Sequence, residues 1–249
     1  MIEFKNISKS FGDQKILDGI NIHFPKGKIS VVIGRSGAGK SVILKQIMGF
    51  LQPDSGQVLI DGQDTTNFTP LEWRKIRKKF GMLFQDSALF DSMNVWENVA
   101  FPLIEHTSKS HSEIDTIVKE KLKLVGLNNA EQKATADLSG GMRKRVALAR
   151  AIALDPEIVL FDEPTSGLDP IVTTVIDHLI IDTQRATGCT YIVISHDITA
   201  AFRIADKIAM IYDGKIVIDA DKEEVKNTND PLVKQFITGS LEGPFDIFY

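Results

Sequence analysis

The sequence predicts an α/β fold, with a mostly parallel core sheet between helices, an antiparallel β layer and a helical insert. Three apolar runs are continuous instead of alternating, as in strands that are covered on both faces: residues 29–33, 158–161 and 191–194. A helical pattern follows each of them, at residues 42–48, 171–187 and about 198–205. This alternation of buried strand and helix decides the fold class.

Turns and helix caps predict the other elements. We expect antiparallel strand pairs around three turns, which are Phe11-Gly12-Asp13, Asp61-Gly62 and Asp213-Gly214. A hydroxyl residue followed three positions later by glutamate marks two helix starts, at Thr69 to Glu72 and at Ser110 to Glu113. From about Asp86 to about Asp155 the pattern is mostly helical and interrupts the alternation.

The composition is that of a globular protein with a sizeable apolar core. The 249 residues are 43% hydrophobic and 25% charged, with a formal net charge of -4. The mild acidity gives no reason to expect a nucleic-acid surface. No apolar run is long enough to cross a bilayer, so a membrane function would need another subunit to span it. The single cysteine, Cys189, fits a reducing cytoplasm and is expected only to pack.

A glycine-rich turn between strand and helix has the pattern G-x-x-x-x-G-K-[ST] and predicts a phosphate-binding loop. The glycines let backbone N–H groups point at phosphate oxygens, and the positive end of the following helix adds to the attraction. Lys40 would place its charge on the β and γ phosphates, and the Ser41 hydroxyl can ligate Mg²⁺. We expect ATP to bind along Gly34, Arg35, Ser36, Gly37, Ala38, Gly39, Lys40, Ser41 and Val42.

The stretch Leu138-Ser139-Gly140-Gly141-Met142 makes the sequence similar to the ATP-binding-cassette (ABC) ATPases, whose signature is an LSGG sequence that opens a helix. The resemblance covers nearly the whole chain, and Met142 departs from the glutamine usual at its position. The motifs occur as an ordered set of Phe11, the phosphate loop, Gln85, the signature, Asp162-Glu163, Ser166-Gly167-Leu168-Asp169 and His196. The resemblance implies the P-loop ABC ATPase fold.

Two carboxylates at the end of a buried strand are expected to act in catalysis. Asp162 can hold the Mg²⁺ shell opposite Ser41, and Glu163 can polarise the water that attacks the γ phosphate. The resemblance implies that His196 contacts the γ phosphate and orients water, and that Gln85 reaches Mg²⁺ and water. It also implies that Phe11 stacks on adenine, although a core position is a second interpretation of this ring.

The signature predicts a second copy of the chain as partner. Ser139, Gly140 and Gly141 form an anion site at a helix N-terminus, and in the family this site faces the nucleotide of the opposite subunit. We therefore expect a homodimer that closes around two ATP molecules. Asp169 resembles the residue that crosses this interface beside the partner's phosphate loop.

The predicted organisation is a single ATPase domain over residues 1–236, followed by an extension at 237–249. Core segments at 1–85 and 156–236 would enclose a helical subdomain at about 86–155. The extension ends in Phe245, Ile247, Phe248 and Tyr249. It is expected either to fold back on its own domain or stay loose, as many termini do, or to reach across to the second ATPase subunit.

The run from Asp86 to Val99 places apolar and aromatic residues where transporter ATPases keep a groove for a helix of the membrane subunit. Ordinary packing of the helical insert is the other interpretation. The phosphate loop, Leu89 to Val99 and Leu138 to Val146 further resemble the ATPase of bacterial phospholipid transporters that maintain outer-membrane asymmetry.

That resemblance implies an ATPase peripheral on the cytoplasmic face of the inner membrane. Its implied partners are integral permease subunits, a small cytoplasmic accessory subunit and a periplasmic lipid-binding protein of the mammalian-cell-entry type. A soluble ATPase that assembles a complex or cofactor stays an alternative. A nucleic-acid or ribosome factor is disfavoured by the acidic balance and the single cassette.

Overall fold

A computed structural model describes residues 1–244 of the chain. The chain divides into two compact units, of which the first holds Met1–Asn67 and Ile194–Tyr249 and the second holds Phe68–Val193. Strand β8 (Thr190–Ser195) is where the chain passes from the second unit back to the first. The predicted helical subdomain at about 86–155 lies within the second unit.

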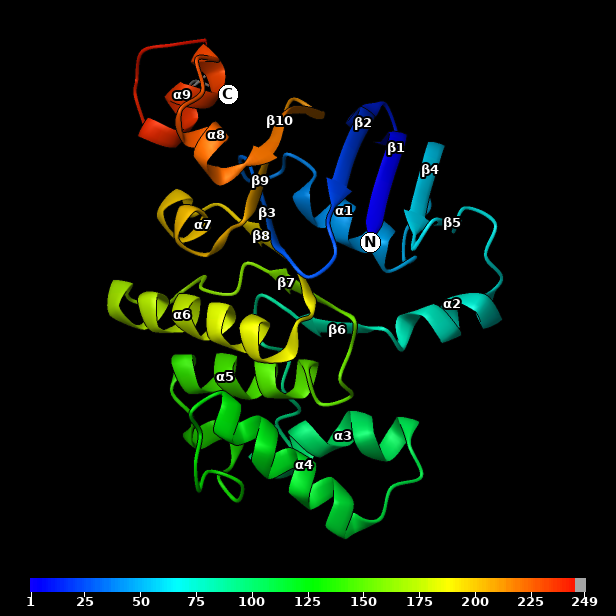
Figure 1. Ribbon diagram of the computed structural model, residues 1–249, viewed down its shortest axis with the longest axis vertical. Coiled ribbons are helices and arrows are strands. Elements are labelled where there is room, and N and C mark those ends of the chain that lie inside the picture. Colours follow the sequence, from blue (N-terminus) through cyan, green and yellow to red (C-terminus); the bar gives the residue numbers. More distant parts are fainter. Residues whose placement is uncertain (245–249) are drawn as a thin grey trace. The chain divides into compact units, whose positions relative to one another are not determined.

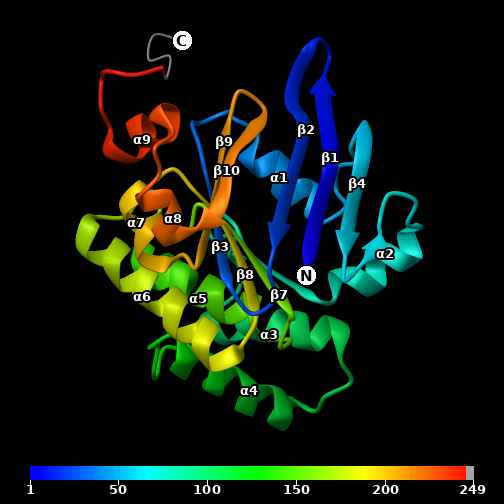
Figure 2. The same ribbon diagram turned by 45° about the horizontal axis from the view of Figure 1, so that its top comes forward.

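The first unit contains the predicted antiparallel layer. Its strands follow the order β2-β1-β4-β5 (Figure 1), and Figure 2 shows β2, β1 and β4 side by side. Their bounds are β1 (Ile2–Phe11), β2 (Gln14–Phe24), β4 (Ser55–Ile60) and β5 (Gln63–Asp64). Its two hairpins turn where the sequence predicts them. Apolar residues of one face are buried, as expected for a sheet with one covered side: Ile2, Phe4, Ile7, Ile20, Ile22 and Phe24.

Parallel strands of the first unit begin the core sheet. Strand β3 (Ile29–Ile33), buried along its whole length, pairs in parallel with β9 (Lys207–Tyr212), which pairs antiparallel with β10 (Lys215–Asp221). Helix α7 contacts β3. The helices of this unit are α1 (Lys40–Ile47), α7 (Ile198–Ile204), α8 (Lys222–Lys226) and α9 (Pro231–Thr238).

The second unit places helices beside a parallel strand pair, β6 (Phe80–Leu83) and β7 (Ile158–Asp162). Helix α5 is central, since it contacts β6, α3, α4 and α6, and Figure 1 shows it between α6 and the pair α3 and α4. The helix bounds are α2 (Pro70–Arg77), α3 (Val95–His106), α4 (His111–Leu124), α5 (Gly140–Ala151) and α6 (Pro170–Thr187), with a 3₁₀ turn at Thr135–Asp137.

Both predicted capping boxes are confirmed, at the starts of α2 and α4. A third, which the sequence interpretation missed, starts α3. Asn94 accepts a hydrogen bond from the Glu97 N–H at 2.8 Å, and the Glu97 carboxylate accepts one from the Asn94 N–H at 2.7 Å. Asparagine is as good an N-cap as serine, so the Asn-x-x-Glu spacing in the sequence could have predicted this helix start.

The start of the C-terminal extension lies against α9. Gly239 takes a left-handed conformation after that helix, and the Ser240 N–H donates to the Gln235 carbonyl at 3.2 Å. Phe245, Ile247, Phe248 and Tyr249 lie outside the described residues, so the role of the tail stays a prediction. Within residues 1–244, the helices lack the length and apolar character needed to span a bilayer. Cys189 is buried, as expected, and its thiol donates to the Pro156 carbonyl at 2.8 Å.

Candidate nucleotide site

The phosphate loop of the first unit is built mainly from backbone. Gly39 has φ +101°, and a Cβ there would lie 2.9 Å from Leu17 Cδ2, so a larger residue would meet both strain and a clash. Helix α1 starts after Gly39 without a side-chain cap. No side chain therefore occupies the N-terminus of this helix, a position at which anions bind.

Lys40 lies across this loop instead of in solvent. Its side chain is 5% exposed, and its ammonium donates to the carbonyls of Gly34 and Arg35, at 2.8 Å each. A cation held by the same turn that presents N–H groups is suited to polyphosphate. Ser41 follows on α1 with an exposed side chain, and Val42 is half-buried.

A cavity of about 450 Å³ lies beside the loop, lined by three segments of the first unit: Gln14 to Ile16, Arg35 to Ala38 and Tyr212 to Gly214. The sequence interpretation used the third segment only as a strand turn. Phe11 is 51% exposed, so the alternative that it is a core residue is wrong. His196, also exposed, directly follows β8, and the next residue, Asp197, caps α7 through its bond from the Ala200 N–H at 3.0 Å.

The second unit brings together the acidic pair and Gln85. Asp162 is the last residue of β7, and Glu163 after it has φ +48°, a left-handed conformation that is costly for a side chain other than glycine. The Ser166 N–H donates to the Glu163 carbonyl at 3.2 Å, and the Gln85 side-chain amide donates to the Ser166 hydroxyl at 3.4 Å. Both carboxylates are half-buried.

Lys144 of α5 joins this cluster, and the sequence interpretation missed it. It is buried, and its ammonium donates to the backbone carbonyl of Gln85. Burial lowers the pKa of Lys144, while the carboxylates of Asp86, Glu163 and Asp162 act in the opposite direction. In the sequence it stands between two arginines, and nothing local distinguishes it from a solvated helix residue.

The signature opens α5 as predicted. Ser139 is its N-cap and accepts a bond from the Met142 N–H at 3.3 Å. A Cβ on Gly141 would lie 2.7 Å from Val172 Cγ1, so this glycine lets α5 approach α6 closely. Asp169 caps α6, accepting bonds from the N–H groups of Ile171 and Val172 at 3.0 Å each. The signature and the residues after β7 are thus packed against each other.

A family model described as ABC transporter matches residues 17–166. The chain belongs to the ABC transporter family. The P-loop ABC ATPase fold is therefore confirmed, and the chain is an ATP-binding, ATP-hydrolysing cassette.

Two curated relatives and one solved structure are similar to this ABC ATPase over most of its length. It is 45% identical to the probable ribonucleotide transport ATP-binding protein mkl of Mycobacterium leprae, over 98% of this chain and 70% of the relative. It is 43% identical to the intermembrane phospholipid transport system ATP-binding protein MlaF of Haemophilus influenzae, over 100% of this chain and 94% of the relative. The dimeric post-hydrolysis ATP-binding cassette MJ0796, bound to ADP and Pi, superposes with a TM-score of 0.80 at 32% identity. The superposition covers 89% of this chain and 99% of the MJ0796 chain.

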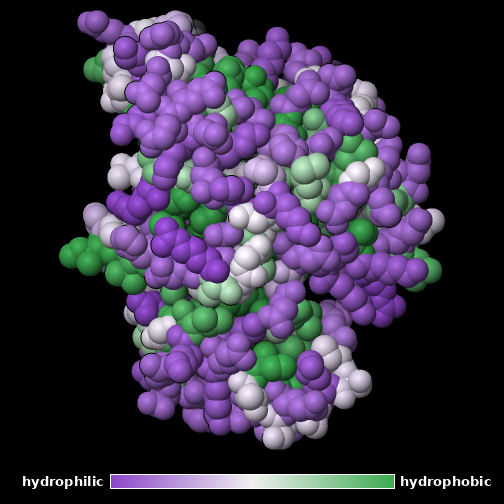
Figure 3. All heavy atoms as spheres, viewed as in Figure 1, coloured by the Kyte–Doolittle hydropathy of each residue, from purple (hydrophilic) through white to green (hydrophobic). Residues whose placement is uncertain are grey.

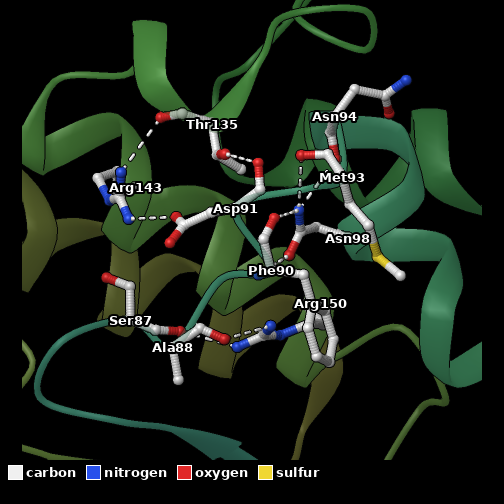
Figure 4. Close-up of polar contacts among 10 residues, drawn as sticks. All are labelled: Ser87, Ala88, Phe90, Asp91, Met93, Asn94, Asn98, Thr135, Arg143 and Arg150. Carbon is white, nitrogen blue, oxygen red and sulfur yellow. Dashed lines mark hydrogen bonds and ion pairs between the residues drawn. The ribbon is translucent and has the colours of Figure 1, made fainter.

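Helix α5 of this ABC ATPase also holds the segment after Gln85 (Figure 4). Arg150 donates to the carbonyls of Ser87 and Ala88, at 2.7 and 2.8 Å, and lies 5.8 Å from the centre of the Phe90 ring. Ser87 and Ala88 both have positive φ, +63° and +45°. Arg143 binds the Asp91 carboxylate at 3.4 Å. Two arginines of the signature helix therefore stabilise a segment whose backbone is strained.

A groove of about 630 Å³ opens in the second unit. Of the run from Asp86 to Val99, Ala88 and Phe90 line it, whereas Val95 and Val99 are buried in the unit. Its other apolar lining comes from Phe80, Gly81, Met82, Phe84, Phe101, Pro102, Ala151 and Leu154. Phe84 and Phe90 are exposed aromatic residues. On the face drawn in Figure 3, hydrophobic patches interrupt a mainly hydrophilic surface where α3 and α5 lie.

The rim of the groove is positively charged. Arg74, Arg77, Lys78 and Arg150 line it together with His106, and none of the described lining residues is acidic. Arg74 of α2 and Lys78, the C-cap of that helix, are four positions apart, a spacing at which like charges repel. Within residues 1–244, no ion pair engages either of them. The groove therefore combines an apolar floor with the positive charge of Arg74 and Lys78 at its rim.

Proposed function

We propose that this ABC ATPase is the energy-supplying subunit of a bacterial transporter that moves phospholipid between the inner and outer membranes. Two copies of the chain close around two ATP molecules on the cytoplasmic face of the inner membrane, where they drive integral permease subunits. One observation supports a permease partner, namely the apolar, cation-rimmed groove of the second unit.

We propose the following roles in hydrolysis. The phosphate loop, residues 34–42, binds the phosphates through backbone N–H groups and the Lys40 ammonium. Glu163 takes a proton from the attacking water, and His196 and Gln85 orient that water. Phe11 stacks on the adenine ring. Asp162 ends a buried strand, and its carboxylate serves as a metal ligand instead of a general base.

We propose that Ser41, Gln85 and Asp162 hold Mg²⁺. Bound Mg²⁺ neutralises charge on the transferred phosphate. Within residues 1–244, no group of three or more histidine, cysteine or acidic side chains is arranged to hold a metal alone. A single carboxylate with a hydroxyl and an amide suits a cation that takes its remaining ligands from phosphate oxygens and water.

The dimer is proposed from the signature, because its anion-binding start at Ser139, Gly140 and Gly141 would complete a nucleotide site of the second copy. Asp169, exposed at the N-terminus of α6, is proposed to lie beside the partner's phosphate loop. The similar cassette MJ0796 is described as dimeric with ADP and Pi bound. A small accessory subunit and a periplasmic lipid-binding protein of the mammalian-cell-entry type complete the proposed assembly.

The substrate is proposed as phospholipid because the Haemophilus relative, named for intermembrane phospholipid transport, aligns over this entire chain. The mycobacterial relative, named for ribonucleotide transport, has a slightly higher identity and favours a second candidate. A phospholipid and a ribonucleotide differ in solubility. Mass spectrometry of the complex, purified from native membranes in mild detergent, separates them, since lipid retained in place of ribonucleotide supports the proposal.

A charge-reversal experiment tests the groove. The double variant Arg74→Glu, Lys78→Glu should lose copurification with the permease, because the partner would then meet like charge at the rim of an apolar contact. Its matched control is Lys75→Glu, an exposed residue of α2 that does not line the groove. Normal copurification and transport in the double variant would remove the groove from the interface, and ATP binding should stay normal in both variants.

A further inference from the structure

We propose that Lys144 is a positioning residue for ATP hydrolysis, whose buried ammonium fixes the backbone of Gln85 beside the carboxylates that end β7. This inference rests on the proposed function, because Gln85, Asp162 and Glu163 have their roles there. Lys144 itself is not expected to touch ATP.

Hydrogen bonds connect Lys144 to the acidic pair in a short chain. The Lys144 ammonium donates to the Gln85 carbonyl, and the Gln85 side chain donates to the Ser166 hydroxyl at 3.4 Å. The Ser166 N–H then donates to the carbonyl of Glu163 at 3.2 Å. The position of Gln85 is therefore fixed at its backbone by α5 and at its side chain by the turn after β7.

Charge explains why a lysine stands here. Lys144 is 5% exposed, and burying an ammonium is unfavourable unless opposite charges and acceptors compensate. The compensating charges are those of Asp86, Glu163 and Asp162. An apolar side chain of similar length would fill the same space without this cost, so packing alone does not account for the lysine.

The neighbouring cations of α5 have other partners. Arg143 donates to the Thr135 carbonyl at 3.2 Å and binds Asp91, whereas Arg145 donates to the Val125 carbonyl at 3.4 Å. Lys144 is thus the cation of the signature sequence that is directed at the acidic pair. It lies five residues after Ser139 on the same helix, so movement of the signature end of α5 would move Gln85 with it.

The test compares Lys144→Met with Lys144→Arg in the purified transporter complex. We expect Lys144→Met to lower kcat for ATP by about ten- to a hundredfold, the scale of a small misplacement of catalytic groups. The KM for ATP should change by less than about threefold, because the residue contacts groups assigned to hydrolysis and not to phosphate binding. Lys144→Arg keeps the charge and its donors, and should restore kcat to within about fivefold of the original chain.

Lys121→Met is the matched control. Lys121 is also 5% exposed and lies in the same unit, but its ammonium pairs with Asp155. Losing a buried lysine there should leave kcat unchanged. Because methionine removes the cost of burying a charge, we expect the melting temperature of Lys144→Met to stay within a few degrees of the original.

Three results would overturn the inference: an unchanged kcat in Lys144→Met, a loss expressed in KM alone, or a loss that follows the melting temperature and is not rescued by arginine. Each would leave the proposed function standing as long as Glu163→Gln stops hydrolysis. If Glu163→Gln turns over normally, the proposed function itself fails, whatever Lys144 does.

Discussion

The phosphate loop of the first unit and the acidic cluster of the second unit are built in opposite ways. The loop is one continuous segment in which backbone N–H groups, glycine conformation and one lysine provide the chemistry. The cluster takes side chains from β7, from the segment after β6, from the turn after β7 and from α5. A backbone site is encoded locally in the sequence, whereas a side-chain cluster depends on how distant segments pack.

The largest effects should separate binding in the loop from hydrolysis at the cluster. Glu163→Gln should retain ATP binding and lose hydrolysis by roughly a hundredfold or more, the scale of a lost general base. It should also trap an ATP-bound dimer, which size-exclusion chromatography detects. Lys40→Ala should instead weaken ATP binding itself, by about ten- to a hundredfold for a lost charged hydrogen bond.

Turnover assays and nucleotide titrations on the two variants give the comparison directly. Glu163→Asp is a useful control, since it keeps the carboxylate and moves it. Near-normal turnover in Glu163→Gln would take this residue out of the role of base. A loss of ATP binding in the same variant would mean that the cluster is needed for binding as well.

A comparably large loss is expected from Ser139→Arg, which tests whether loop and signature meet across two copies. The variant should lose ATPase activity while each chain still binds ATP, because bulk and charge stand at a contact made by the partner. Mixing it with Lys40→Ala should restore activity to about a quarter of the original, since half the dimers have one complete site.

The mixing experiment has a clear opposite result. If isolated Ser139→Arg chains no longer bind ATP, the signature acts on the nucleotide of its own chain. The proposal of a site shared between two copies would then be wrong. Ser139→Thr keeps the hydroxyl that caps α5 and should retain activity, which separates a lost contact from a lost helix start.

The sequence predicted most elements because their signals are local. The phosphate-loop strand and helix, the hairpins at Asp61 and Asp213 and the capped starts of α2 and α4 all follow from spacing within a few residues. The start of α3 was missed although its Asn94 and Glu97 obey the same rule. Helix α8, with five residues, was not predicted, since one helical turn has almost no periodicity.

The sites were less predictable where they depend on distant segments. No spacing in the sequence tells which of Arg143, Lys144 and Arg145 turns towards Gln85, because adjacent helical residues differ in direction by 100° and only the packing of α5 selects one. The hydrogen bonds from Arg150 to the carbonyls of Ser87 and Ala88 likewise join positions more than sixty residues apart. The exposure of Phe11 was uncertain for the same reason, since an aromatic residue at a strand end is common both in cores and at binding sites.

The smallest predicted effect concerns Phe11, which adds an aromatic ring to a site built mainly from backbone groups and Lys40. Phe11→Ala should weaken ATP binding by about fivefold, the equivalent of about 1 kcal/mol for a lost stacking contact. Because the ring is half exposed, its removal should change the melting temperature little. Phe11→Tyr keeps the stacking face and should bind ATP normally.

Tripolyphosphate makes this prediction specific, because it offers the phosphate loop its ligand without a base to stack on. Phe11→Ala and the original chain should bind it equally, and Phe50→Ala, which removes an exposed aromatic ring of the same unit, should leave both ligands unaffected. Equal losses for ATP and tripolyphosphate would instead mean that Phe11 supports the loop, and the first unit would then depend on side chains in the way the acidic cluster does.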